Sequence, residues 1–201
     1  MKKRIPEALI WLRLLLGFVI IGLCVAQPAD YKALSVVLLT IGLLSDIFDG
    51  IIARKLGIST IRLRRLDSTI DQVFFIAVAF ATYWQCPHFF RKNGLQIGVL
   101  VGLEALTYVV SLVKFRKEIA THSIGAKLWT LTLFGVLVQV LLQCDSHWLF
   151  QVCFWLGTLT RLEILAIILT LKKWTNDVPS LYHAWRLRQG KEIKRNKMFN
   201  G

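Results

Sequence analysis

The sequence predicts an all-α, polytopic membrane protein with six transmembrane helices and a C-terminal helix on the membrane surface. Hydrophobic residues make up 55% of the 201 positions, and the mean hydropathy is +0.56. Soluble domains contain about 45–50% apolar residues. Stretches nearly free of charge recur along the chain, each close to the roughly 20 residues that a bilayer-spanning helix needs. We therefore expect lipid, rather than a soluble core, to surround most of the chain.

Six apolar stretches are predicted to span the bilayer. The first follows Lys2, Lys3 and Arg4 in the manner of a secretory signal, but no small-residue cleavage site stands out after it, so we expect it to be retained. The predicted spans are Ala8 to Ala26, Ala33 to Ala53, Asp71 to Phe89, Leu95 to Val113, Leu128 to Cys144 and His147 to Leu171.

The basic residues are distributed unequally between the two sides of this topology. Twenty of the 25 lysines and arginines fall on the side that carries both termini, and three fall on the other side. The positive-inside rule therefore predicts cytoplasmic termini, and we expect a bacterial inner membrane as the location. Contact with anionic lipid headgroups explains the net charge of +13, so we expect membrane lipids and no nucleic acid as partners. Residues 1–173 form the predicted transmembrane domain, and residues 174–201 a basic cytoplasmic tail with a short interfacial helix.

The four cysteines have no paired spacing typical of a metal site. Cys86 and Cys144 both lie near predicted outer helix ends, where a disulfide could form. We favour unpaired thiols and keep the disulfide as the alternative.

Several charged residues lie inside predicted spans. We assign no role to three of them: Glu104, Arg161 and Glu163.

Four of the twelve acidic residues lie between positions 46 and 71. Asp46 and Asp49 are three residues apart, and Asp67 and Asp71 are four apart, so each pair shares one face of its helix. Because the two helices are predicted to be antiparallel neighbours joined by a short basic loop, the four carboxylates should lie at a similar depth on the cytoplasmic side. A centrally placed Asp costs about 2.5–3.5 kcal/mol in a membrane, so the cluster requires compensating cations.

Hard divalent ions such as Mg²⁺ or Mn²⁺ suit ligation by carboxylates alone, whereas zinc usually recruits His or Cys. Two such ions about 3.5–4 Å apart form the arrangement that clamps a phosphoryl displacement. The alternative is a set of aspartates that cap helices and pair with arginines, which we favour less for four residues at these spacings. Arg54, about one turn from Asp49, could donate hydrogen bonds to a phosphate group. The small residues Gly50 and Ala53 leave room for a ligand.

The acidic cluster lies within a longer motif that resembles the signature of the CDP-alcohol phosphotransferases, which are integral membrane enzymes with six core helices and are commonly homodimers. Leu63 stands where this family has a glycine. Pro6 to Arg13 resembles the N-terminal stretch of the branch that includes phosphatidylglycerophosphate synthases, and Ser123 to Thr130 is similar to a Gly-Lys-x-x-Thr region of the family. The residues of the motif are Asp46-x-x-Asp49-Gly50-x-x-Ala53-Arg54, followed by Asp67-x-x-x-Asp71.

This resemblance implies metal-dependent transfer of a phosphatidyl group from CDP-diacylglycerol to a hydroxyl acceptor, with release of CMP. By the same resemblance, Asp71 would also be the general base that takes the acceptor proton. The implied metal ligands are Asp46, Asp49, Asp67 and Asp71, and the implied residues around the cytidine diphosphate are Asp46, Asp49, Gly50, Ala53 and Arg54.

A group of basic residues on the predicted cytoplasmic side favours a phosphorylated acceptor, for which glycerol 3-phosphate is our choice. Inositol phosphate, serine, an amino alcohol and phosphatidylglycerol stay open as other acceptors. From a different class, a small cation-coupled transporter is the alternative, although such proteins usually distribute their acidic residues over internal repeats. The candidates for binding the acceptor phosphate are Arg62, Arg64, Arg65, Lys114, Arg116 and Lys127.

Overall fold

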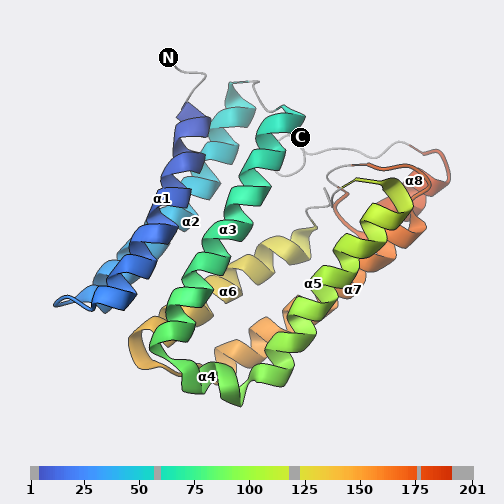
Figure 1. Cartoon of the computed structure of the whole chain (residues 1–201). Helices are drawn as coiled ribbons and strands as arrows, with labels where there is room; N and C mark the ends of the chain where they lie inside the picture. Colours follow the sequence, from blue (N-terminus) through green and yellow to red (C-terminus); the bar gives the residue numbers. More distant parts are fainter. Residues whose placement is uncertain (1–4, 57–59, 118–122, 176–177, 192–201) are drawn as a thin grey trace. The chain divides into compact units, whose positions relative to one another are not determined.

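The computed structural model of the chain describes residues 5–56, 60–117, 123–175 and 178–191, apart from the side chains at positions 5, 54, 55, 61, 62, 64 and 124. The described residues form helices and no strand, as the sequence predicts (Figure 1). The helices are α1 (Ile5–Ala26), α2 (Tyr31–Lys55), α3 (Ile61–Gln85), α4 (Pro87–Lys92), α5 (Gly94–Phe115), α6 (Ile124–Gln143), α7 (Trp148–Thr170) and α8 (Leu181–Arg188).

Five of the described helices are long and apolar enough to cross a membrane, namely α1, α2, α5, α6 and α7. The remaining predicted span, Asp71 to Phe89, corresponds to α3, which is long enough at 25 residues. Its first turns contain arginines and the aspartates Asp67 and Asp71, which lower its apolar character. The count of six spans therefore stays a prediction.

The boundaries of α3 differ from the predicted span of Asp71 to Phe89. The helix begins ten residues earlier, at Ile61, because the Thr60 side chain caps it by accepting a hydrogen bond of 3.2 Å from the Leu63 amide. It ends at Gln85 since Cys86 precedes a proline, and a residue before proline disfavours helical backbone. Asp67 and Asp71 therefore lie on the same helix, as their spacing predicts.

The chain divides into two compact units. One comprises Met1–Lys92 and Phe134–Ser146, and the other comprises Asn93–Leu133 and His147–Gly201. The C-terminal half of α6 thus belongs to the first unit and its N-terminal half to the second.

In the first unit, α1 packs against both α2 and α3, and the three helices lie side by side (Figure 1). Phe74 of α3 is buried at their junction, with 1% of its surface exposed. A Cβ atom at Gly42 of α2 would lie 2.3 Å from the Phe74 ring, and one at Gly17 of α1 would lie 3.3 Å from it. At Gly42 a side chain would require the Phe74 ring to move, and at Gly17 it would be tightly packed. This contact fixes α3 against its neighbours one turn beyond Asp71.

A disulfide between Cys86 and Cys144 joins the end of α3 to the residue after α6. Our preference for unpaired thiols at these two positions was therefore wrong. The cysteines are 58 residues apart in sequence, so helical periodicity could not indicate that their helix ends meet. Lys92 and Asp145, the residue after Cys144, form an ion pair of 3.8 Å. Cys24 and Cys153 are free and buried.

In the second unit, α5 packs against α7 through a pair of intramembrane charges. Arg161 of α7 forms an ion pair with Glu104 of α5, and its guanidinium lies 4.5 Å from the ring centre of Trp129. A Cβ atom at Gly157 would lie 2.4 Å from Trp129 Nε1, so this glycine makes room for the indole. Charged residues in lipid require such partners, and the pairing gives Glu104 and Arg161 a structural role that sequence spacing did not reveal.

The short helix α8 lies where the sequence predicts an interfacial helix. Ala184 is fully buried against a cluster that includes Ile167 of α7, whereas Tyr182 and Trp185 are 60% and 53% exposed. Exposed aromatic rings next to basic residues are typical of a helix that lies in the headgroup region.

Candidate active site

The second half of α2 supplies two of the predicted site residues. Asp46 and Asp49 are one helical turn apart and project from the same face, as their spacing predicts. The Asp49 side chain is 3% exposed, whereas that of Asp46 is 33% exposed. The two carboxylates therefore differ in accessibility. Asp49 is buried, whereas Asp46 can be reached from the protein surface.

The first turns of α3 supply the other two. Asp67 and Asp71 are one turn apart, and their side chains are 28% and 27% exposed. The Thr60 cap sets where α3 begins, and Asp67 lies seven residues after it. Both carboxylates remain accessible to a substrate.

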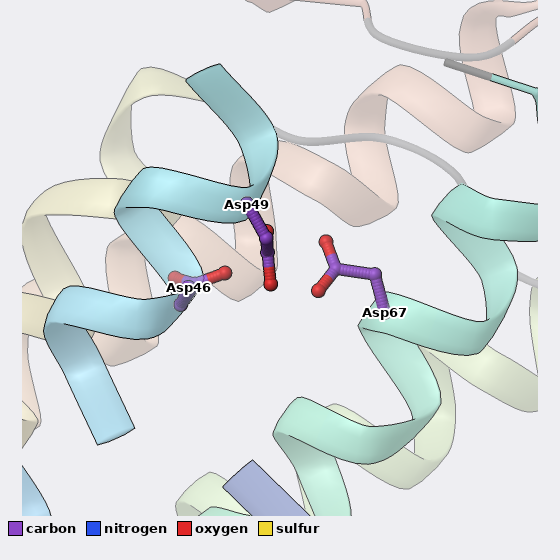
Figure 2. A group of neighbouring side chains, drawn as sticks. All are labelled: Asp46, Asp49 and Asp67. Atoms are coloured by element: carbon purple, nitrogen blue, oxygen red, sulfur yellow. The ribbon is translucent and has the colours of Figure 1, made fainter. Parts of the chain in front are cut away.

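The carboxylates of the two helices converge. Figure 2 shows Asp46 and Asp49 pointing from α2 toward Asp67 on α3. Each of these three residues offers a carboxylate oxygen that lies within 4.8 Å of the others. Asp71 is outside this trio but is connected to it through a shared partner on α1.

That partner is Arg13, which sequence reasoning did not place in the site. Its side chain is 1% exposed, and Nη1 lies 3.5 Å from Asp46 Oδ1 and 3.0 Å from Asp67 Oδ1. The same Nη1 contacts Asp71 Oδ1, and Nη2 contacts Asp49 Oδ2. One guanidinium thus touches all four predicted carboxylates. The available signal was that Arg13 is the single charge in the predicted span Ala8 to Ala26, where a charge requires a partner.

The donor set fits a hard divalent cation. All four side chains offer carboxylate oxygens, which Mg²⁺ and Mn²⁺ prefer. Arg13 contacts all four carboxylates, so at least one positive charge already lies among them, and a divalent cation would bind on the same oxygens.

The other residues predicted to bind ligands differ in exposure and lie in both units. Ala53 is 6% exposed, and Gly50 is partly buried one turn before it on α2. In the second unit, Lys114 Nζ donates hydrogen bonds of 3.0 and 2.7 Å to the carbonyl oxygens of Ile168 and Leu169. Arg65, Arg116 and Lys127 are exposed, whereas the side chains of Arg54, Arg62 and Arg64 lie outside the described residues.

A comparison of the sequence with protein-family models decides the family. The model described as CDP-alcohol phosphatidyltransferase matches residues 3–171. The chain belongs to this family. Neither a curated protein nor a solved structure matches the chain.

CDP-alcohol phosphatidyltransferases transfer a phosphatidyl group from a CDP-alcohol in phospholipid synthesis, so this chain is a transferase embedded in a membrane. The family generally depends on divalent metals, and a cluster of aspartates is present on α2 and α3. Leu63, which replaces a signature glycine, occupies the first turn of α3. Its backbone is helical there, so this position needs no glycine conformation in this chain.

Proposed function

We propose that this protein transfers a phosphatidyl group from CDP-diacylglycerol to a small alcohol, with glycerol 3-phosphate as the best candidate, and releases CMP. The convergence of the Asp46, Asp49 and Asp67 oxygens within 4.8 Å, at signature positions of the family, supports this proposal most strongly. We further propose a catalytic membrane domain of residues 1–173, a cytoplasmic tail of residues 174–201 and a homodimer, as is common in the family.

In this proposal the α2 motif residues bind the cytidine diphosphate group of the donor. Asp71 accepts the proton of the acceptor hydroxyl, which its 27% exposure makes accessible to a substrate. The acceptor oxygen then bonds to the phosphatidyl phosphorus, and the bond between that phosphorus and the CMP oxygen breaks. Held by the four aspartates, two Mg²⁺ or Mn²⁺ ions would neutralise phosphate charge and polarise the reacting phosphorus. The α2 residues concerned are Asp46, Asp49, Gly50, Ala53 and Arg54.

The proposal of a phosphorylated acceptor depends on the basic residues. Arg65 is exposed and lies two residues before Asp67, within the same unit as the cluster. Lys114 already donates to two carbonyl oxygens at the end of α7, which makes it a weaker candidate. Arg116 and Lys127 are exposed and remain candidates for binding the acceptor phosphate.

The function is tested by measuring CMP release from CDP-diacylglycerol by the purified full chain in detergent with Mg²⁺ or Mn²⁺. Each acceptor is added separately: glycerol 3-phosphate, inositol phosphate, serine, an amino alcohol and phosphatidylglycerol. We expect glycerol 3-phosphate to give the highest rate. A higher rate with another acceptor would correct the acceptor, and no CMP with any of them would contradict the proposed reaction.

We propose that the carboxylate cluster faces the cytoplasm and the Cys86–Cys144 disulfide faces the other side of a bacterial inner membrane. Asp71 precedes Cys86 by 15 residues on α3, or about 22 Å of helical rise. That distance approaches the roughly 30 Å thickness of the hydrocarbon core. Disulfides persist in oxidising compartments such as the periplasm, so the disulfide and the positive-inside pattern favour the same orientation.

This orientation predicts two free thiols and one disulfide in membranes prepared from cells. Unreduced chain, denatured in detergent and treated with a maleimide polymer, should gain two adducts, at Cys24 and Cys153, and reduced chain should gain four. The Cys86→Ser variant is the matched control and should gain three without reduction, because Cys144 then lacks its partner. Four adducts on the unreduced wild-type chain would show that Cys86 and Cys144 are not joined and so contradict their exposure to an oxidising compartment.

A further inference from the structure

Arg13 makes the most concentrated set of charged contacts among the described residues. It lies on α1, and its side chain is 1% exposed inside an apolar helix. Its Nε donates a hydrogen bond of 3.4 Å to Ser45 Oγ on α2, and Ser45 in turn donates one of 2.7 Å to the Gly42 carbonyl. With Nη1 and Nη2 on the carboxylates, all three guanidinium nitrogens are engaged.

The two terminal nitrogens of Arg13 contact different numbers of carboxylates. Nη2 contacts Asp49, the buried carboxylate, while Nη1 alone contacts the three accessible ones, Asp46, Asp67 and Asp71. The oxygens that a divalent cation would take on the accessible side are therefore those that Nη1 contacts. A guanidinium and a divalent cation on the same oxygens repel each other strongly in a site largely shielded from water.

We infer that Arg13 is the internal counterion of the carboxylate cluster and competes with divalent cations for it. Arg13 holds the carboxylates of α2 and α3 together, and cation binding displaces Nη1 from Asp46, Asp67 and Asp71. The contacts of Nη2 with Asp49 and of Nε with Ser45 hold the side chain in place during this exchange. Arg13 is thus a positioning residue that weakens metal affinity and limits repulsion among the carboxylates. The inference rests on the proposed metal-dependent function and adds to it a determinant of metal affinity.

The test measures binding of Mn²⁺ to the purified full chain by electron paramagnetic resonance, without donor or acceptor. Arg13→Gln removes the charge and leaves a shorter, polar side chain. We expect it to bind Mn²⁺ at least about tenfold more tightly than the wild type, because one positive charge a few ångströms from the ions is gone. Its melting temperature should fall in the absence of divalent ions, and added Mg²⁺ should raise it more than it raises that of the wild type.

Arg161→Gln is the matched control because Arg161 is also an arginine inside a span and in an ion pair, but with Glu104 in the second unit. Its Mn²⁺ affinity should equal that of the wild type. Unchanged or weaker Mn²⁺ binding by Arg13→Gln would overturn the counterion role. If the wild type itself bound no Mn²⁺, the proposed function would fail as well, so the two failures are distinguishable.

A measurement on the wild-type chain covers the case in which Arg13→Gln does not fold. Phenylglyoxal modifies accessible guanidinium groups, and mass spectrometry locates the modified arginine. Saturating Mg²⁺ should increase modification of Arg13 several-fold and leave that of Arg161 unchanged. Equal modification of Arg13 with and without Mg²⁺ would contradict its displacement by the cation.

Discussion

Replacing Asp71 with Asn is expected to lower the rate of CMP release by about 100- to 10,000-fold, the range that a general base contributes. The amide has nearly the same shape as the carboxylate but cannot accept the proton of the acceptor hydroxyl. Asp71 lies outside the trio of closely spaced carboxylates and is 27% exposed, as a group that must meet the acceptor should be. Donor binding should persist, because Asp46 and Asp49 on α2 are unchanged. Single-turnover CMP release and a separate titration with CDP-diacylglycerol distinguish the two effects.

Asp145→Asn provides the matched control for this substitution. Asp145 is in the same unit but pairs with Lys92 after α6, and its side chain is 59% exposed. Surface ion pairs of this kind contribute about 0–1 kcal/mol, so the variant should release CMP at the rate of the wild type. Turnover by Asp71→Asn within a few-fold of the wild type would remove Asp71 as the base. Loss of donor binding in the same variant would instead indicate that Asp71 acts mainly as a metal ligand.

The convergence of α2 and α3 could be predicted from sequence because it depends on local spacing. Residues three or four apart share a helix face, and a short loop makes consecutive helices antiparallel neighbours. The family model confirms the resemblance read from the motif, whose positions are fixed within each of these helices. The same local reasoning placed Asp67 and Asp71 on one helix face, but it did not use the Thr60 cap to locate the start of α3.

Contacts between residues distant in sequence could not be predicted in this way. Arg13 is 33 residues from Asp46, and helix periodicity does not indicate which residue of α1 faces the cluster. The ion pair between Arg161 and Glu104 and the disulfide between Cys86 and Cys144 join segments more than 50 residues apart for the same reason. The sequence did indicate that a charge inside an apolar span needs a partner. Identifying that partner required the packing of the helices.

Removing divalent ions is expected to abolish CMP release, and adding Mg²⁺ or Mn²⁺ should restore it. Without divalent cations, the four carboxylates that Arg13 contacts would repel the negatively charged diphosphate of the donor. Two unit charges 4 Å apart interact by about 4 kcal/mol at an effective dielectric constant of 20, so even one uncompensated pair would weaken donor binding by several hundredfold. The measurement is CMP release after treatment with EDTA and again after titration with Mn²⁺.

Recovery on titration distinguishes this effect from irreversible unfolding by the chelator, and the Mn²⁺ stoichiometry tests the number of ions. Two ions per chain are expected, because two divalent cations offset the charge of four carboxylates and so remove the repulsion of the donor diphosphate. A stoichiometry of one would mean that Arg13 remains on part of the cluster while a single ion binds the rest. Full CMP release in excess EDTA would contradict metal dependence altogether, and the carboxylates would then need another role in the transfer.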